Sequence, residues 1–555
     1  MSRQAIPISD PEARQREKPA SFVAHARLIS ALTLVSRILG IAREGVMSAY
    51  FGAGTVASAF AVAFKVPNLF RKLLGEGAIS TAFIPLYVGQ LKSGNEAQAN
   101  RFAAAAVNLL TMILVALTLI GEAALWATAH WVHLRSENLL AVRLTAVMLP
   151  YVLLICGTAF LGGILQVHKR FALPALAPVL LNVIHIAVIV IGAWILMLGR
   201  SHGEQQIALQ TRLAYWLAGF VLLAGVGQIA MLVPALRAVG FRPMWIGHFW
   251  TPAVRQMLRL SVPLGLALGV LQLSVVLDTV ITVSLTRGSN PHETIRLFGH
   301  AVAYPLALGA VARLNWAQFL YQFPLGVFAI ALATAIFPGL SADALDANHD
   351  KFNRVLRQGI FITLLEGLPA SIGLILVRYP VCRLLLQHGR FTAQDTQWVA
   401  LSVVFYSAAI WAFSLQQVMN RAYYALHDMT TPLMMSVVTI VVNTAVEIPL
   451  CFTRLGEAGM AVGTMASFTV QAVVMLYLLD RKTGGLGIPN IAASAAKMLL
   501  ACALMTGACL LVQRAPFYPH ATGTLASVEQ LAILISVGAA TYAGVCWRMG
   551  LGRGE

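Results

Sequence analysis

The stretch that decides the fold runs from Leu34 to Tyr87 and reads LVSRILGIAREGVMSAYFGAGTVASAFAVAFKVPNLFRKLLGEGAISTAFIPLY. Its two apolar segments have the length of membrane helices, yet the charged side chains in them include Arg37, Arg43, Lys65, Arg71, Lys72 and Glu76. An arginine or lysine at the middle of a membrane costs at least ~2.5 kcal/mol on insertion scales, so such residues usually face a protein interior or a watery cavity. We therefore expect these side chains to line a pathway inside a membrane protein.

The type of charge indicates the kind of substrate. Arginine presents a planar fork of donors that suits phosphate groups, so an anionic substrate is expected. Pro67 is expected to break the second segment beside Arg71. Arg27 and Arg43 lie near helix ends, where long stems also allow a side chain to reach the lipid headgroups, and for these two residues both interpretations stay open.

The composition places the chain among membrane proteins. Of its 555 residues, 58% are hydrophobic and 11% are charged, whereas about 25% are charged in soluble domains. The net charge of +17 is dispersed over the ends of the apolar runs, which favours positive-inside topology over nucleic-acid binding. The six cysteines lie in or beside apolar runs without CxxC spacing, so we expect core residues and neither disulfides nor a metal site.

Apolar runs long enough to span a membrane, about 20 residues each, recur along the chain. They cover residues 26–53, 56–90, 99–133, 139–168, 171–198, 211–239, 254–286, 304–342, 353–387, 396–426, 431–453, 456–480, 489–513 and 525–549. We therefore expect an all-α polytopic membrane protein with about 14 transmembrane helices and both termini on one side. The distribution of Lys and Arg favours the cytoplasm for that side.

Prolines indicate an internal repeat. Nearly the same interval separates Pro67 from Pro324 as Pro174 from Pro432, and transporters are often built from repeated halves. The predicted domains are a disordered cytoplasmic tail, an N-terminal six-helix lobe, a C-terminal six-helix lobe and two additional transmembrane helices, over residues 1–23, 24–240, 241–482 and 483–555.

Three segments carry a family resemblance: SRILGIARE, AFKVPNLFRKLLGEGAISTAFIP and QFPLGVFAIALATAIFP. They resemble the MurJ/MviN-type lipid II flippases of the multidrug/oligosaccharidyl-lipid/polysaccharide (MOP) exporter superfamily. The resemblance implies two lobes with pseudo-twofold symmetry around a central cavity, and a transporter instead of an enzyme. It also implies transport by alternating access of lipid II, the undecaprenyl-pyrophosphate-linked precursor of peptidoglycan, from the inner to the outer leaflet of the bacterial inner membrane.

The resemblance implies that the protein takes part in cell-wall synthesis and the maintenance of cell shape. It also suggests roles for individual residues. Arg37, Arg43 and Arg71 match family positions associated with an essential cationic cavity, with Lys65 and Glu76 as further substrate-binding residues. The final pair of helices is expected to help hold the lipid tail. Membrane lipids and cell-wall synthesis enzymes are the other expected partners.

The eighth predicted span departs from the family pattern. The family has an acidic residue, an arginine and a glutamate just before the Phe-Pro, where this chain has Gln318, Phe319 and Gln322. In the second span, Ser58 replaces an expected aspartate. Arg313 lies on the same segment but about 120° around the helix from the missing face, so it would substitute only if the helix turned or unwound.

A second polar group lies in later spans. Asp278 is isolated in an apolar segment, and Asn443 and Glu447 are spaced to share one helix face. Together with Thr464 they resemble the sodium site of some family members, so we expect coupling to Na⁺ or H⁺. The alternative is that Asp278 and Glu447 only pack the lobes together. Asn182, His185, Gln272, Gln416 and Gln417 are interpreted as hydrogen-bonding groups between helices.

Two other functions stay open from the sequence. One is an ion-coupled exporter of another polyprenyl-linked glycolipid, and the other is a non-transporting scaffold for cell-wall enzymes. The missing charges at Gln318, Phe319 and Gln322 favour these alternatives, whereas the retained arginines favour lipid II transport. The polar segment 287–303 is expected to be a solvated external loop without a metal motif.

Overall fold

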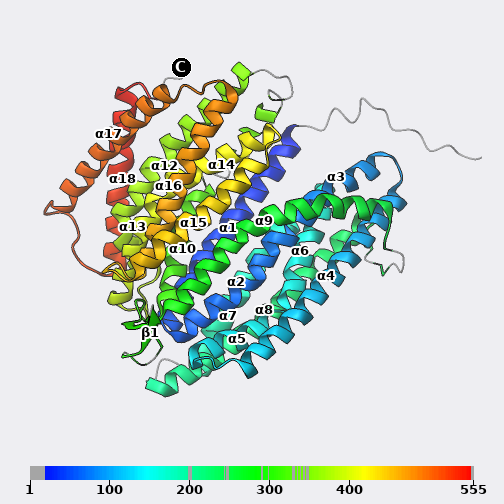
Figure 1. Ribbon diagram of the computed structural model, residues 1–555, viewed down its shortest axis with the longest axis horizontal. Helices are drawn as coiled ribbons and strands as arrows, with labels where there is room; N and C mark the ends of the chain where they lie inside the picture. Colours follow the sequence, from blue (N-terminus) through cyan, green and yellow to red (C-terminus); the bar gives the residue numbers. More distant parts are fainter. Residues whose placement is uncertain are drawn as a thin grey trace, which may run out of the picture.

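The computed structural model describes residues 19–551, apart from 198–202, 243, 246–248, 289, 291, 298, 328–331, 334–335, 338, 342–343 and 345–348. Most of the described chain is helical (Figure 1). The N-terminal half contains α1 (Pro19–Phe51), α2 (Thr55–Phe70), the π-helical turn η2 (Arg71–Gly75), α3 (Ala78–Lys92), α4 (Glu96–Trp131), α5 (Ser136–Met148), α6 (Tyr151–Val167), α7 (Ala172–Ile195) and α8 (Gly203–Ala238). The C-terminal half contains α9 (Pro252–Leu285), β1 (Thr294–Leu297), β2 (His300–Ala303), α10 (Ala310–Val327), α12 (His349–Leu385), α13 (Ala393–Ala408), α14 (Ile410–Ala425), α15 (Thr430–Cys451), α16 (Ala458–Thr483), α17 (Ile488–Gln513) and α18 (Thr524–Arg548).

The predicted all-α membrane architecture is confirmed. Among the described residues, nine helices are long and apolar enough to cross a membrane, and the bent pairs α5–α6 and α13–α14 bring the number to eleven. The three other predicted spans coincide with α1, with α2 to α3 and with α10, which are richer in charge or interrupted. The expected number of about 14 is consistent with this arrangement.

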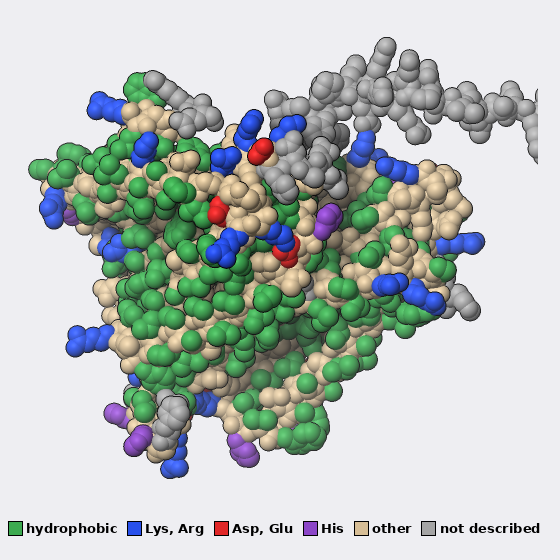
Figure 2. All heavy atoms as spheres, turned by 45° about the horizontal axis from the view of Figure 1, so that its top comes forward, with side chains coloured by type: hydrophobic (Ala, Val, Ile, Leu, Met, Phe, Trp, Pro, Cys, Tyr) green, Lys and Arg blue, Asp and Glu red, His purple; other side chains and the backbone are tan. Residues whose placement is uncertain are grey.

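The surface has the pattern expected of a protein immersed in lipid. Figure 2 shows a broad hydrophobic middle, with most lysines and arginines near the margins of the face. Large apolar side chains are freely exposed on several helices, including Trp194 at 81% and Leu266 at 69% of their surface. Soluble proteins rarely expose such extensive apolar surface, so lipid is the natural environment of these helices.

The two halves of the chain occupy different parts of the molecule. In Figure 1, α2 to α8 lie toward the right and the bottom of the view, and α12 to α18 lie at the upper left. Helices α1 and α9 connect them, because α1 contacts both α7 and α12, while α9 contacts both α3 and α15. The larger apolar core joins the N-terminal half to α10 and α13, and a second core lies among α12, α14, α16, α17 and α18. The exact lobe boundaries stay a prediction.

Two predicted loop regions differ from expectation. Residues 1–18 of the predicted tail lie outside the described residues, but residues 19–23 are helical because α1 begins at Pro19, a residue well suited to the first helical turn. The segment 287–303, predicted as a loop, contains the antiparallel hairpin β1–β2. Gly299, with φ of +85°, supplies the left-handed conformation at its turn.

Candidate functional site

A cavity of about 970 Å³ lies between the two halves of the chain. Its walls come from α1, α2, η2 and α7 of the N-terminal half and from α9, α10, α13, α14, α15 and α16 of the C-terminal half. The predicted residues Arg43, Lys65 and Arg71 line it, together with Lys72. These cations are therefore gathered at one internal site, as expected from the cost of placing them in lipid.

Arg43 is held in place by contacts from three helices. Its Nη1 donates a hydrogen bond of 3.2 Å to the Asn182 amide oxygen, and its Nη2 forms an ion pair with Glu44. Its guanidinium carbon lies 5.6 Å from the centre of the Phe64 ring, within the range of a cation–π interaction. Glu44 in turn accepts a 3.0 Å hydrogen bond from the indole of Trp316 on α10, so this network joins the two halves.

Arg71 begins the π-helical turn η2, four residues after Pro67. Proline has no backbone N–H to donate within a helix, and π-helical turns are frequent at functional sites. Arg71 forms an ion pair with Glu76, in which the two side chains are 30% and 54% exposed. Its Nε is buried without a hydrogen-bond partner among the described residues. The guanidinium thus retains a donor for a ligand.

Two residues of the predicted anion site lie outside the cavity lining. The Nη2 of Arg37 donates a 3.2 Å hydrogen bond to the carbonyl oxygen of Gly326, which does line the cavity. Glu76 pairs with Arg71 but is not itself a lining residue. The structure therefore places Arg37 at the edge of the site, against the backbone of α10, and Glu76 in an ion pair with Arg71 outside the lining.

The residues of the predicted cation site come together on α9 and α15. The Nδ2 of Asn443 donates to Asp278 Oδ1 at 2.8 Å and to Glu447 Oε2 at 3.0 Å. Glu447 has no exposed surface, and its Oε1 and the Oδ1 of Asn443 are buried without partners in the described chain. Thr464 lines the cavity, but its hydroxyl donates to the Met460 carbonyl oxygen of its own helix at 3.2 Å.

The chemistry of this polar cluster fits a hard cation or a proton. Carboxylate and amide oxygens are the ligands that hard cations prefer, and two such oxygens lack partners. Within the described residues, no group of three or more His, Cys, Asp and Glu side chains is placed to hold a metal ion. Lys65 of α2 reaches the same part of α9, with its Nζ 3.5 Å from the hydroxyl of Thr279, the residue after Asp278.

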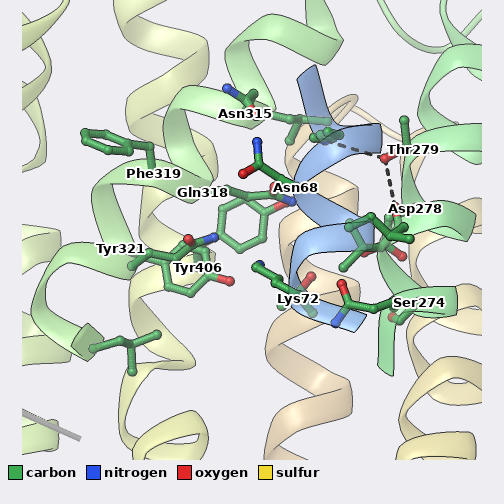
Figure 3. Close-up of a pocket in the computed structure, with 18 of the residues that line it drawn as sticks. Asn68, Lys72, Ser274, Asp278, Thr279, Asn315, Gln318, Phe319, Tyr321 and Tyr406 are labelled. Atoms are coloured by element: carbon green, nitrogen blue, oxygen red, sulfur yellow. Dashed lines mark hydrogen bonds between the residues drawn. The ribbon is translucent and has the colours of Figure 1, made fainter. Parts of the chain in front are cut away.

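The α10 side of the cavity is uncharged. Gln318, Phe319 and Gln322, which replace the charges expected from the family pattern, all line the cavity. The Nε2 of Gln318 donates a 3.2 Å hydrogen bond to the hydroxyl of Tyr406. Figure 3 shows Gln318 on the side of α10 that faces Asn68, whereas Phe319 projects the other way.

Arg313 does not replace the missing arginine. It is 4% exposed, and its Nε and Nη2 donate to the carboxylate of Glu457 at distances from 2.8 to 3.0 Å. Its Nη1 lies 3.2 Å from Asp395 Oδ1. This buried ion-pair cluster joins α10 to α13 and to the start of α16, away from the cavity lining.

Sequence reasoning missed several residues of the site. Asn68, Trp316, Tyr321 and Tyr406 line the cavity, but tryptophan and tyrosine in an apolar span carry no distinctive signal. Asn182 does bond between helices, as predicted, since its Nδ2 also donates to the Ser36 carbonyl oxygen.

The other residues predicted to form hydrogen bonds between helices differ from Asn182 in their position. His185, Gln272, Gln416 and Gln417 all line the cavity. Both ring nitrogens of His185 and the Oε1 of Gln416 lack partners among the described residues. The four-residue spacing of Gln416 and Asn420 on α14 is a signal that could have indicated a shared polar face.

The two halves also contact each other at the end of the molecule that carries the β hairpin. The Ser48 hydroxyl donates to the Leu386 carbonyl oxygen, and the Arg390 amide donates to the Ala49 carbonyl oxygen, each at 2.9 Å. Gly309 has a φ of +89°, and a Cβ there would collide with the Ala53 carbonyl oxygen. Backbone therefore meets backbone between the halves at this end.

Comparison with known proteins identifies the family. The family model described as "Lipid II flippase MurJ" matches residues 47–527. The chain is 31% identical to a lipid II flippase MurJ of Burkholderia cenocepacia over 470 residues, which cover 82% of this chain and 83% of the relative.

Solved structures share the fold. The structure described as "Lipid II flippase MurJ, inward closed conformation" superposes with a TM-score of 0.70 at 22% identity, covering 94% of this chain and 98% of that one. An inward-facing multidrug resistance MATE family transporter of the MOP superfamily gives a TM-score of 0.60 at 14% identity, covering 83% and 98%. With a model match over most of its length, the chain belongs to the MurJ lipid II flippase family.

Proposed function

We propose that this protein translocates lipid II from the inner to the outer leaflet of the bacterial inner membrane, with both chain termini in the cytoplasm. The observation that carries the proposal is the position of Arg43, Lys65, Arg71 and Lys72 around one cavity between the halves of a lipid-exposed helical protein. Membership of the MurJ family supports the choice of substrate. An enzymatic role is not proposed, because the family is one of transporters.

The polar headgroup is the part of the substrate that needs a pathway, because the prenyl chain can remain in lipid. A pyrophosphate entering the cavity would meet the guanidinium groups of Arg43 and Arg71, which suit phosphate oxygens. Glu44 and Glu76, which pair with these arginines, would keep their charges neutralised when no substrate is bound. Loading then exchanges the carboxylate partner of each arginine for a phosphate oxygen, so the guanidinium groups keep an anionic partner in both states.

Alternating access supplies the movement. Substrate enters while the halves are joined at the hairpin end, and a rocking motion that breaks these contacts would expose the cavity to the other side. A membrane potential of about 100 mV, negative inside, favours outward movement of an anionic headgroup by ~2.3 kcal/mol per charge. The potential therefore provides part of the driving force.

A transported cation is the second component of the proposal. Asp278, Asn443 and Glu447 would hold Na⁺ or a proton, and the bound charge would offset one of the two carboxylates. Because Asp278 lies on α9 and the other two lie on α15, loading this site would alter how these helices pack. Glu447→Gln is expected to remove or strongly reduce the dependence of transport on Na⁺ or pH, as measured in proteoliposomes with imposed ion gradients. Unchanged dependence on both would leave Glu447 with a packing role only.

The direct test of the anion site is translocation of fluorescent lipid II by the purified protein in proteoliposomes. Arg71→Ala is expected to reduce translocation at least tenfold, because one charge-assisted contact contributes about 1.5–3 kcal/mol. The matched control is Arg237→Ala, which removes an exposed arginine from the last turn of α8. A folded Arg71→Ala protein with the activity of the control would contradict the proposal.

A further inference from the structure

Six carboxamide side chains line the cavity from α10 and α14, and we refer to them as the amide wall: Asn315, Gln318, Gln322, Gln416, Gln417 and Asn420. None of the cavity-lining residues of α10 is charged. The only charged lining residue of α14 is Arg421, whose guanidinium carbon lies 5.3 Å from the centre of the Phe337 ring. The amide wall thus contrasts with the cationic residues of α1, α2 and η2.

Two groups of the amide wall have unused hydrogen-bonding capacity. The Oε1 of Gln416 and the Oδ1 of Asn420 are buried and accept no hydrogen bond within the described residues. The Gln416 side chain is deeply buried, at 5% exposure, and the spacing of four residues places both amides on one face of α14. A buried acceptor without a partner is unfavourable by about 1–3 kcal/mol. Both oxygens are therefore suited to receive O–H or N–H donors from a ligand in the cavity.

Aromatic rings stand beside these amides. The rings of Tyr321 and Tyr406 stack with their centres 5.0 Å apart. Gln318 of the amide wall donates a hydrogen bond to the Tyr406 hydroxyl. Figure 3 shows Gln318, Tyr321 and Tyr406 grouped together, with Asn68 and Lys72 toward the α2 side. Phe413 and Phe468 form another pair in the lining, 4.7 Å apart.

Amides beside aromatic rings suit an uncharged sugar. Carboxamides both donate and accept hydrogen bonds, which matches hydroxyl and acetamido groups, and aromatic faces pack against apolar C–H surfaces. The six amides themselves carry no charge, so they offer no ion-pair partner to a carboxylate or ammonium group that is desolvated against them. The wall therefore discriminates against the charged parts of a headgroup.

We propose that the amide wall binds the uncharged saccharide of the lipid-linked substrate, while the arginines of the N-terminal half bind its pyrophosphate. This inference rests on the proposed function and adds a second subsite to the same cavity. It also gives the replaced positions Gln318 and Gln322 a role, because neutral amides can bond a sugar without the ion pairs that charged residues would require.

The test measures binding of three lipids to the full-length protein in nanodiscs: lipid II, the same lipid without its peptide, and sugar-free undecaprenyl pyrophosphate. In the double variant Gln416→Leu with Asn420→Leu, we expect affinity for both sugar-bearing lipids to fall at least tenfold, since two hydrogen bonds are lost. Affinity for the sugar-free lipid should stay within about twofold of wild type. Asn108→Leu, which removes a buried carboxamide of α4 outside the cavity lining, is the matched control and should leave all three affinities nearly unchanged.

The outcomes separate this inference from the proposed function. If wild type binds none of the three lipids, the proposed function fails and the subsite fails with it. If wild type prefers the sugar-bearing lipids and the double variant keeps that preference, only the amide wall is overturned. Equal loss for all three lipids, or loss confined to the peptide-bearing lipid, also overturns it. Thermal unfolding checks the fold, and the single variant Asn420→Ala tests the same preference if the double variant is unstable.

Discussion

At the scale of single residues, Arg43 shows how a charged side chain is positioned inside a membrane protein. The side-chain oxygen of Asn182 on α7 accepts a hydrogen bond from Arg43, and the side-chain nitrogen of Asn182 donates to the Ser36 carbonyl oxygen. The support is neutral, so it positions the guanidinium without cancelling its charge. Glu44 supplies the exchangeable partner.

Removing this support should impair transport without removing any charge. Asn182→Leu is expected to raise the lipid II concentration for half-maximal transport by roughly tenfold, because a hydrogen bond to a charged group contributes about 1.5–3 kcal/mol. Asn108→Leu is the control, since it removes a buried amide of α4 that donates to the Met244 carbonyl oxygen and lies outside the cavity lining. Equal effects of the two substitutions on transport would show that Asn182 acts only through general packing.

The sequence predicted some of these positions better than others. Arg43, Lys65 and Arg71 were predictable because charges in apolar spans seek an interior site. The contact of Arg37 with Gly326 was not, since its partner is a backbone carbonyl oxygen 289 positions away. The hydroxyl of Thr464 bonds its own helix, an option that any threonine in a helix has. The roles assigned to all these residues stay predictions.

At the scale of helices, the cluster around Arg313 fixes α10 against its neighbours. The buried Arg313 of α10 and Glu457 at the start of α16 meet the partly buried Asp395 of α13 there. The guanidinium is fully engaged, which explains why this arginine is unavailable to the cavity. The cluster therefore sets the rotation of α10 and, with it, the direction in which Gln318 points.

Removing one carboxylate from this cluster should destabilise the protein. Breaking a buried ion pair leaves a charge without its partner and costs about 3–5 kcal/mol, so Glu457→Gln is expected to lower the melting temperature by several degrees. Arg454→Ala, at an exposed position three residues earlier, serves as the control in the same thermal unfolding measurement. A melting temperature equal to that of wild type would show that Asp395 alone suffices to neutralise Arg313.

Helices were the most predictable level of the structure, and their interruptions the least. Long apolar runs indicated nearly every helix, because spanning segments must satisfy their backbone hydrogen bonds internally. A break at Pro67 was expected, but Pro67 lies inside α2, and the helix passes into the π-helical turn η2 only at Arg71. The hairpin β1–β2 was also missed, since two strands of four residues lie in a segment with loop-like polarity.

At the scale of the whole molecule, contacts between the halves at the hairpin end must break and re-form during alternating access. Arg135, between α4 and α5, adds an ion pair of 2.9 Å with Glu293 and a hydrogen bond of 3.0 Å with the Thr286 carbonyl oxygen. Its guanidinium also lies over the Tyr304 ring. Side-chain and backbone contacts together hold this end.

Locking these contacts should stop transport. A short bifunctional reagent that attaches to thiols through disulfide bonds is applied to the double variant Ala49→Cys with Arg390→Cys. It is expected to join the two introduced cysteines, because the backbones at these positions are hydrogen-bonded. Transport in proteoliposomes should fall to background and recover when the linker is reduced. The six native cysteines are buried, so wild type treated in the same way is the control. Full transport by the cross-linked double variant would exclude opening at this end.

The relation between the halves was the part least accessible from sequence. Regular intervals between prolines suggested a repeat, and the resemblance implied a central cavity. Neither could specify that α1 and α9 connect the two parts or that backbone meets backbone at Gly309. Such contacts depend on the fit of surfaces from distant segments, which no local pattern encodes.

The most direct test of lipid II transport is the amount of lipid II in the outer leaflet of bacteria depleted of their own flippase and supplied only with this protein. We expect wild type to restore outer-leaflet lipid II and Arg71→Ala, expressed at the same level, to leave it near the depleted value. The comparison also includes the Burkholderia cenocepacia relative as a positive control for the host. If that relative restores exposure and equally expressed wild type does not, lipid II transport by this protein is contradicted.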